Sequence, residues 1–271
     1  MKDWKFFRQT GIINHTVFLG LAKVHISLMI KESMLPMKQR IWELDALRGI
    51  GILIMTAVHL CYDLAEFWGF PNLTGLPLFS LMLEYGGILF VLLSGLCVTL
   101  GHRTFRRGVA VFAWGMLCTA VTWSMARLGL LDHSLVIRFG ILHCLGSCMM
   151  LWPLFRRFPP GILAGIGVLS LFTGAVFQRI TVSRPYLFPL GLTAEQFSSG
   201  DYFPLLPYLG WFLLGSVLGR RLYPHKQSRF PGTDPDKPLL RFLRFCGTHS
   251  LVIYLIHQPL IFLIYSILML L

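Results

Sequence analysis

An arginine and a histidine inside one apolar stretch are the residues of this chain whose types and spacing best suit chemistry. Arg48 and His59 form the two ends of the run RGIGILIMTAVH. Eleven helical residues return to within about 20° of the starting direction and rise about 16 Å, so both side chains would lie on one helix face. A guanidinium binds anions and an imidazole exchanges protons near neutral pH. The pair therefore indicates anion binding or proton transfer at two levels of one helix.

The same face carries further charged residues. Asp45 precedes Arg48 by three positions, and Asp63 and Glu66 follow His59 by four and seven. An ionisable residue inside a membrane span costs about 2.5–3.5 kcal/mol on insertion scales, and such residues face the bundle interior or a wet cavity. Two structural alternatives remain open: Arg48 as a topological charge paired with Asp45, and His59 as a buried histidine hydrogen-bonded to Asp63.

The helix that carries them is one of several long apolar stretches. Hydrophobic residues make up 55% of the 271 residues, charged residues make up 13%, and mean hydropathy is +0.67. A soluble globular chain is less apolar than this. The composition therefore predicts an all-α, polytopic membrane helix bundle with about seven transmembrane helices. Stretches long enough for roughly 30 Å of hydrocarbon recur at 46–66, 78–101, 108–126, 135–155, 161–178, 204–219 and 248–270.

The net charge of +12 at pH 7 reflects where the Lys and Arg residues lie along the chain. With a cytoplasmic N-terminus, all but four of the 24 fall in segments predicted to be cytoplasmic. The positive-inside rule therefore predicts an N-in, C-out topology. Because topology explains the charge, nucleic acid is not expected as a partner, whereas membrane lipids are. The four exceptions are Arg127, Arg138, Arg179 and Arg184.

Other predicted spans carry polar groups at depths comparable with that of His59. Counted from the outer face, Glu84 lies about 9 Å into the second span, His59 about 10 Å into the first, and His143 about 12 Å into the fourth. Arg138 lies near the outer start of the fourth span. We expect Glu84, His59 and His143 to reach one level, provided that their helix faces converge.

Two segments further along the chain add polar groups. The seventh span brings Tyr254 and His257 along one side, with Gln258 beside them, and places His257 near mid-membrane. Polar residues would then form a track from Arg48 through His257 to the outer group of His59, Glu84 and His143. The outer segment DYFP offers Asp201 and Tyr202 where a polar substrate would arrive, although an ordinary interfacial turn explains it equally well.

The domain organisation is simple. Residues 37–271 are expected to form one integral membrane domain, preceded by an extension over 1–36 that is either an interfacial helix or a start-site artefact. The Pro-rich stretch from Tyr223 to Pro238 is interpreted as a cytoplasmic linker. The cysteines are interpreted as apolar packing residues, and no metal is expected, because Cys144 and Cys148 lack further ligands at matching depth.

Several segments resemble a known family of membrane enzymes. An arginine separated from a histidine by ten residues resembles the signature of bacterial membrane acyltransferases that modify extracytoplasmic sugars, and LDALRGIGILIMTAVHLCYDL fits it without a gap. The resemblance extends over about 40–271 and includes three further segments: IRFGILHCLG, DYFPLLPYLGWFLLGSVLG and THSLVIYLIHQPLIF. Together they resemble the bacterial branch of the heparan-α-glucosaminide N-acetyltransferase catalytic-domain family, within the transmembrane acyltransferase superfamily.

This resemblance implies an acyltransferase of the bacterial cytoplasmic membrane. Acyl-CoA, most simply acetyl-CoA, would be the co-substrate bound from the cytoplasm, and the acyl group would pass to an extracytoplasmic carbohydrate, a glycan or amino sugar. The donor's phosphates would be bound by Arg48, Arg103, Arg106 and Arg107, because a planar fork of N–H donors suits phosphate.

The resemblance also implies roles for the remaining polar residues. His59 would act as general base with its ring oriented by Asp63, and a covalent acyl-histidine is the second possibility. His257, Tyr254 and His143 are candidates for stabilising the thioester oxyanion or relaying the proton. The candidates for acceptor binding are Glu84, Arg138, Asp201, Tyr202 and Tyr254.

The chain departs from the eukaryotic enzyme of that family in one respect. As the resemblance maps it, that enzyme's catalytic histidine falls after the first helix, but no histidine lies between His59 and His102 here. N-transfer and O-transfer therefore both stay open. A proton-coupled transporter or flippase of a small polar or glycan substrate is the competing hypothesis, since intramembrane ionisable groups also suit proton coupling. Coenzyme A binding would distinguish the two.

Overall fold

The computed structural model describes residues 40–68, 77–183 and 185–268. Within them β-structure is limited to isolated bridges that join Phe139 to Tyr202 and Thr181 to Thr193, so the all-α prediction is confirmed. The extension predicted over 1–36 lies outside the described residues. The helices are α3 (Trp42–Trp68), α4 (Pro77–Val98), α5 (Thr104–Arg127), α6 (Ile141–Phe155), α7 (Pro160–Phe177), α8 (Leu205–Leu222), α9 (Pro238–Thr248) and α10 (Ser250–Leu268), with short 3-10 helices η3 (His133–Leu135) and η4 (Pro185–Leu190).

Every predicted span coincides with a helix, but not every helix is long and apolar enough to cross a membrane. Among the described residues, four helices qualify by length and hydropathy, namely α3, α4, α5 and α7, and the bent pair α9–α10 makes a fifth if counted as one span. Helix α6 has only 15 residues, and α8 ends with Arg220 and Arg221. The chain is thus a multi-pass membrane protein, while the count of seven spans and the N-in orientation stay predictions.

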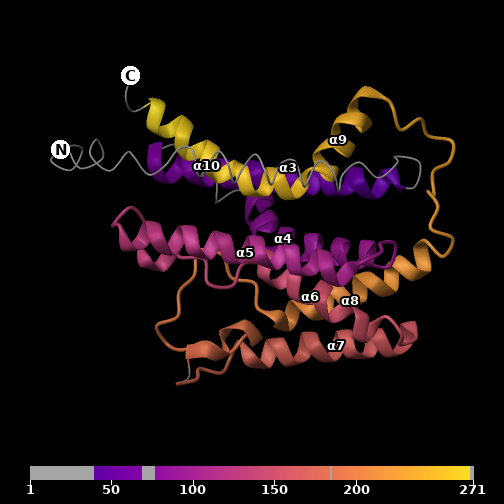
Figure 1. Cartoon of the computed structure of the whole chain (residues 1–271), viewed down its shortest axis with the longest axis horizontal. Coiled ribbons are helices and arrows are strands. Elements are labelled where there is room, and N and C mark those ends of the chain that lie inside the picture. The colour runs from indigo at the N-terminus through magenta and orange to yellow at the C-terminus, as the bar shows by residue number, and fades with distance from the viewer. Residues whose placement is uncertain (1–39, 69–76, 184, 269–271) are drawn as a thin grey trace. The chain divides into compact units, whose positions relative to one another are not determined.

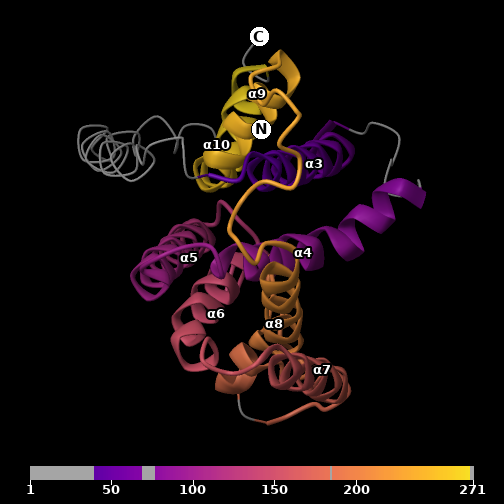
Figure 2. The same cartoon turned by 90° about the vertical axis from the view of Figure 1, so that its right-hand side faces the viewer.

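The helices from α3 onward pack in two layers (Figures 1 and 2). One layer holds α3, α9 and α10, and the other holds α4 to α8. In the second layer α5 packs along α6, and α4 and α7 both pack along α8. Its core surrounds the fully buried side chains of Val91, Leu163 and Phe212. This layer supplies the scaffold against which α3 and α10 present their polar faces.

Backbone contact between α4 and α8 depends on glycine. A Cβ at Gly95 would collide with the carbonyl group of Phe212, and a Cβ at Gly215 would collide with that of Leu92. Small residues let helix backbones approach closely and gain packing that lipid tails cannot supply. The contact fixes α8, and with it the loop before α8 that carries Asp201.

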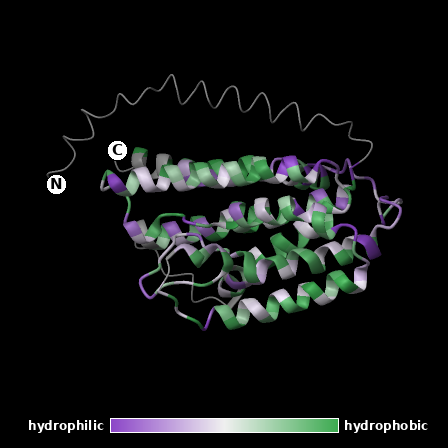
Figure 3. Cartoon of the chain, turned by 60° about the horizontal axis from the view of Figure 1, so that its bottom comes forward, coloured by the Kyte–Doolittle hydropathy of each residue, from purple (hydrophilic) through white to green (hydrophobic). Residues whose placement is uncertain are grey.

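Hydropathy divides the bundle along its length. Figure 3 shows hydrophobic residues along the helices and hydrophilic residues collected at the helix ends and connections. This is the pattern of a bundle with lipid at its sides and water at its ends. We name the ends after the first and last residues of α3: the Trp42 end and the Trp68 end.

Helix α9 is absent from the sequence prediction, which has only a linker from Tyr223 to Pro238 there. The linker is held to the start of α3, because the buried carboxylate of Glu43 accepts hydrogen bonds from the Ser228 hydroxyl (2.9 Å) and the Arg229 backbone N–H (2.8 Å). Helix α9 then begins at Pro238 and meets α10 at 81°. The segment is therefore a fixed part of the Trp42 end.

Candidate functional site

Two histidines from different helices meet in the middle of the first layer. The ring centroids of His59 on α3 and His257 on α10 lie 5.1 Å apart, with an interplanar angle of 79°. Helix α10 is packed against α3, which brings together residues almost two hundred positions apart in the sequence. The two rings are therefore in edge-to-face contact, and no hydrogen bond joins them among the described residues.

The hydrogen bonds of the two imidazoles fix their neutral tautomers. His59 Nδ1 lies 3.0 Å from the Met55 carbonyl oxygen, and His257 Nδ1 lies 2.6 Å from that of Tyr254. A carbonyl oxygen can only accept, so each neutral ring carries its hydrogen on Nδ1 and its lone pair on Nε2. Each ring thus offers an Nε2 that can take up a proton or attack an electrophile.

The two Nε2 atoms differ in their exposure. His59 is exposed, whereas His257 is only 8% exposed, and its Nε2 has no hydrogen-bond partner among the described residues. A buried polar atom without a partner is costly, and such atoms in native structures call for an explanation such as a catalytic role. The Nε2 lone pair of His257, buried next to the exposed imidazole of His59, is such an atom.

The carboxylate of Asp63 has a different partner from the one predicted. It accepts a hydrogen bond of 3.2 Å from the Gln258 side-chain amide, while the His59 ring N–H is taken by Met55, one turn earlier on α3. Asp63 is buried and still interacts electrostatically with His59. The structure therefore places Asp63 beside His59 but gives the orientation of the ring to a backbone carbonyl. The side chain of Glu66 lies outside the described residues.

Asp201 joins three elements at this point. Its Oδ2 accepts hydrogen bonds from the Ile141 backbone N–H at the start of α6 (2.9 Å) and from the Tyr254 hydroxyl on α10 (3.2 Å). It also interacts electrostatically with His59. We call this group the imidazole cluster, and its members are His59, Asp63, Asp201, Tyr254, His257 and Gln258.

His143 belongs to a different environment. Its Nδ1 accepts a hydrogen bond of 3.1 Å from the Gly140 N–H, and its Nε2 lies 3.3 Å from the Thr119 hydroxyl, which itself donates to the Ile137 carbonyl. These bonds require hydrogen on Nε2 and leave no free lone pair on the ring. The ring is 1% exposed and stacks on Phe139. The described contacts give it a structural role at the start of α6.

Three acceptor candidates also lie apart from the imidazole cluster in the described contacts. Glu84 is exposed on α4, and it interacts with the neighbouring Tyr85. Tyr202 donates its hydroxyl hydrogen to the Phe188 carbonyl oxygen (2.7 Å). The guanidinium of Arg138 lies 5.5 Å from the centroid of the Phe197 ring. Glu84, His59 and His143 were expected at a common level, but among the described residues no hydrogen bond or ring contact joins any two of them.

The predicted cation group lies at the Trp42 end. Arg48 Nη1 lies 3.5 Å from Asp45 Oδ1, and the guanidinium interacts with the buried thiol of Cys97 on α4. Arg107, from the first turn of α5, also interacts electrostatically with that thiol. Arg48 and Arg107, 59 positions apart in the sequence, therefore both act electrostatically on one thiol. Arg103 and Arg106 are exposed at the start of α5.

Sequence reasoning missed three contributors to these sites. Met55 orients His59 through its backbone, which no side-chain pattern can reveal. Cys118 on α5 interacts electrostatically with both Asp201 and Tyr254, yet its type suggested only packing. Cys97 interacts with both Arg48 and Arg107 at the Trp42 end. The depth of Cys118 along its predicted span is the one sequence signal that could have identified it.

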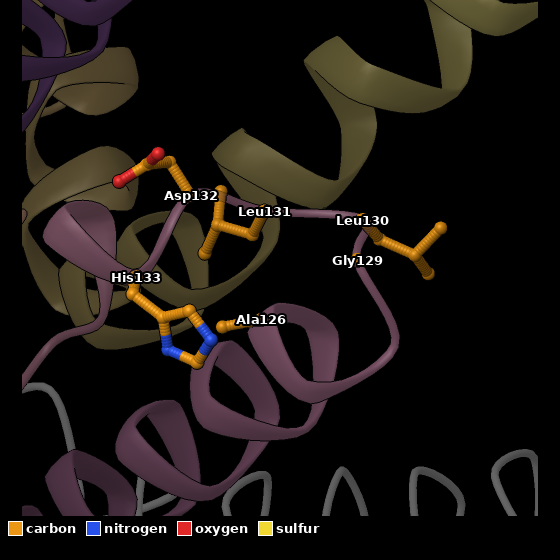
Figure 4. Close-up of a pocket in the computed structure, with 6 residues that line it drawn as sticks. All are labelled: Ala126, Gly129, Leu130, Leu131, Asp132 and His133. Carbon is orange, nitrogen blue, oxygen red and sulfur yellow. The ribbon is translucent and has the colours of Figure 1, made fainter.

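A surface hollow of about 440 Å³ lies where α5 connects to α6, at the Trp68 end (Figure 4). Asp132 caps this turn: its Oδ1 accepts the Ser134 backbone N–H (2.7 Å). Hydrogen bonds from the Ser134 hydroxyl and backbone N–H hold the pKa of the Asp132 carboxyl below its usual range. None of the predicted site residues lines this hollow, whose walls are Ala126, Gly129, Leu130, Leu131, Asp132 and His133.

A second hollow, of about 370 Å³, contains one predicted acceptor residue, Arg138. The wall of this hollow combines the rings of Trp123 and Phe188 with the Arg138 guanidinium. The Arg127 guanidinium lies 4.8 Å from the centroid of the Trp123 ring. Among the described residues, no group of three or more His, Cys, Asp or Glu side chains could hold a metal ion. The lining of the second hollow is Thr119, Trp123, His133, Val136, Arg138 and Phe188.

Comparison with known proteins adds a family to this geometry. Residues 40–259 match the family model described as heparan-alpha-glucosaminide N-acetyltransferase, catalytic. The matched range contains the whole imidazole cluster and the arginines at the Trp42 end. No curated protein and no solved structure matches the chain. Because the family match covers most of the chain, this multi-pass membrane protein belongs to the heparan-α-glucosaminide N-acetyltransferase catalytic family, a family of membrane acetyltransferases.

Proposed function

We propose that this protein transfers an acetyl group from cytoplasmic acetyl-CoA to a hydroxyl or amine of an extracytoplasmic glycan or amino sugar, in the cytoplasmic membrane of a bacterium. The observation that carries the proposal is the pair of imidazoles, His59 and His257, with both Nε2 lone pairs available inside an acetyltransferase domain. The N-in topology places the Trp42 end in the cytoplasm and the Trp68 end outside.

The exposed His59 is the general base in this proposal. Its Nε2 removes the proton from the acceptor's O–H or N–H while the acceptor atom attacks the thioester carbonyl carbon. The carbon–sulfur bond then breaks, and the coenzyme A thiolate takes up a proton, so that the free thiol leaves. His257, buried beside His59, is suited to pass the proton on.

The donor would bind from the Trp42 end. Arg48 and Arg107, which both interact with the Cys97 thiol, support a site for the phosphates of acetyl-CoA, and Arg103 and Arg106 add positive charge at its edge. The pantetheine arm of coenzyme A separates its phosphates from its thioester. That separation suits a site in which Arg48 and His59 stand about 16 Å apart along one helix.

The acceptor would enter from the Trp68 end. The hollow around Arg138 supplies aromatic rings and a guanidinium, which suit a sugar ring and its polar substituents. Thr119 lines this hollow, and its neighbour Cys118 interacts with Asp201 of the imidazole cluster. In this proposal the acceptor would approach the imidazole cluster along α5, which carries both Thr119 and Cys118.

A covalent acetyl-histidine is the second form of the mechanism. Here His59 Nε2 attacks the thioester carbonyl carbon, the carbon–sulfur bond breaks, and coenzyme A leaves as the thiolate. In a second step the acetyl group moves from nitrogen to the acceptor, whose released proton balances protonation of the thiolate. The unpartnered His257 Nε2 supports this form equally, since it can receive the proton that the acceptor loses. Trapping distinguishes the two, because only the covalent form leaves radioactivity on the protein when labelled acetyl-CoA is added without acceptor.

The test of the proposed function uses purified protein in phospholipid vesicles. Labelled acetyl-CoA is supplied with glucosamine as an amine acceptor or glucose as a hydroxyl acceptor, and labelled sugar is measured. We expect transfer by the wild-type protein, at least a hundredfold loss in His59→Ala and His257→Ala, and full transfer in His225→Ala, an exposed histidine outside the site. Undiminished transfer in His59→Ala would remove the mechanism. Absence of coenzyme A binding by the wild-type protein would favour the transporter hypothesis.

A further inference from the structure

The exposed face of α9 is apolar. Leu239, Phe242 and Phe245 are 67%, 52% and 59% exposed. Residues three apart on a helix differ by about 60° in direction, so these three side chains form one strip along α9. Arg241 is also exposed, at the margin of the strip. A short helix with an exposed apolar strip and a basic margin has the pattern of helices that lie in a membrane surface.

The opposite face of α9 is fixed to α3. A Cβ at Gly247 would collide with the carbonyl group of Asp45, and a Cβ at Gly49 would collide with that of Leu243. Cys246, between these contacts, is 4% exposed. The close packing holds α9 in one orientation, so its apolar strip cannot turn inward to join the bundle core.

The direction of α9 follows from its angle to α10. The two helices meet at 81°. Helix α10 has 19 residues and carries no Asp, Glu, Lys or Arg, as is typical of a membrane-spanning helix. A helix nearly perpendicular to a membrane-spanning helix lies close to the membrane plane. The bend is at His249, so α9 lies at the N-terminal end of α10, beside the first turns of α3.

The charge around α9 is strongly positive. Seven Lys and Arg residues but only two acidic residues occur over 220–244. Two of these arginines have protein partners: Arg244 donates to the Pro235 carbonyl and to Asp236, and Arg220 donates to the Arg156 and Phe158 carbonyls. A basic segment beside a membrane is attracted to anionic headgroups by about 1 kcal/mol per Lys or Arg near the surface. The basic residues are Arg220, Arg221, Lys226, Arg229, Lys237, Arg241 and Arg244.

We propose that α9 is a membrane-surface helix that inserts Leu239, Phe242 and Phe245 into the leaflet at the Trp42 end and binds anionic lipid headgroups through the surrounding Lys and Arg residues. Apolar burial supplies the non-specific part of this contact, and the basic residues select the anionic lipid. Because α9 packs on Asp45 and Gly49, which flank Arg48, the leaflet holds the start of α3 in place.

Tryptophan fluorescence in vesicles tests the insertion. Phe242→Trp is compared with Gly232→Trp, which lies in the exposed linker and has open space around its Cβ. Each variant is measured against wild-type protein, which gives the background from the native tryptophans. We expect brominated phosphatidylcholine to quench the tryptophan at position 242 and aqueous acrylamide to quench the one at position 232. Acrylamide quenching at both positions would place α9 in water. Protection of position 242 from both quenchers would mean that protein covers it, as in contact with a second copy. Either result overturns the proposal.

Vesicle composition tests the headgroup preference. We expect a higher Tm in phosphatidylcholine vesicles containing phosphatidylglycerol than in phosphatidylcholine alone, and loss of at least half of that gain in the double variant Lys237→Gln/Arg241→Gln. Arg179→Gln, an exposed arginine at the Trp68 end, is the matched control and should keep the gain. Equal gains in the double variant and the control would overturn the lipid assignment. Neither measurement uses acetyl transfer, so failure of the proposed function leaves this test intact.

Discussion

The Tyr254 hydroxyl donates a 3.2 Å hydrogen bond to Asp201, whose same oxygen also accepts the first backbone N–H of α6. This carboxylate ties α10 in one layer to α6 and the loop before α8 in the other. The hydrogen bond thus joins the histidine-bearing layer to the scaffold beside the two imidazoles. Its strength therefore bears on how well the imidazole cluster is held.

Removal of this hydroxyl should loosen the bundle. In Tyr254→Phe, Asp201 keeps only the Ile141 N–H among these two donors, and hydrogen bonds to charged groups contribute about 1.5–3 kcal/mol. We expect a lower Tm in detergent and reduced transfer, with most of the ring packing retained. Tyr62→Phe, an exposed tyrosine of α3, is the control and should leave Tm unchanged. An unchanged Tm in Tyr254→Phe would show that the bond contributes nothing to stability.

The arginine at the Trp42 end should be required for donor binding. Coenzyme A at 100 times its Kd should stabilise wild-type protein by about 2.7 kcal/mol if only the native state binds it. We expect this gain to vanish in Arg48→Ala and to be partly kept in Arg48→Lys, which retains the charge without the planar fork. Thermal shift in detergent measures it, with Arg127→Ala at the Trp68 end as control. Full stabilisation of Arg48→Ala would locate the donor site elsewhere.

His143 should matter for stability and not for proton transfer. Thr119→Val removes the acceptor of its Nε2–H and leaves that buried group unpaired, at a cost of about 1–3 kcal/mol. We therefore expect a lower Tm but an unchanged dependence of kcat on pH in this variant. His257→Ala should show the reverse, with a near-normal Tm and lost transfer. A shifted pH profile in Thr119→Val would restore His143 as a catalytic candidate.

The cap at Asp132 should make stability depend on pH at the acid end. Its pKa is lowered in the folded state, so its stabilising contribution is present above the unfolded value of about 3.9 and is lost as the pH falls through the folded value. Wild-type protein should therefore lose more Tm than Asp132→Asn when the pH falls from 5 to 3. Asp234→Asn provides the comparison, because Asp234 accepts only one backbone N–H, from Asp236, in a linker turn. Parallel Tm curves for wild type and Asp132→Asn would refute the cap's contribution.

The helices were predictable from sequence because the length and hydropathy of a span are local properties. The seven apolar stretches all coincide with helices, and α3 even extends the predicted range. Helix α9 was missed because its apolar residues are interrupted by Arg241 and Arg244 and follow a Pro-rich segment. Its helical form depends on packing against α3, which no local pattern records.

The candidate site was predictable only in part. Spacing along α3 placed Arg48 and His59 correctly on one helix, but depth placed His257 between Arg48 and the outer group of His59, Glu84 and His143, whereas its ring contacts His59. Which helix faces converge is a tertiary property, so depth alone grouped His59 with His143 and Glu84, whereas the described contacts pair His59 with His257 and Asp201. The expected Asp63–His59 bond failed for a local reason, since the Met55 carbonyl lies one turn away and competes for the same N–H.

The rings of His59 and His257 both belong to the layer of α3, α9 and α10. Movement of that layer as one unit against α4 to α8 would keep the distance between the two rings constant, but it would break the hydrogen bond between Tyr254 and Asp201. Helices α3 and α10 therefore set the geometry of the imidazole pair, and the Asp201 carboxylate connects that pair to α6 and the loop before α8.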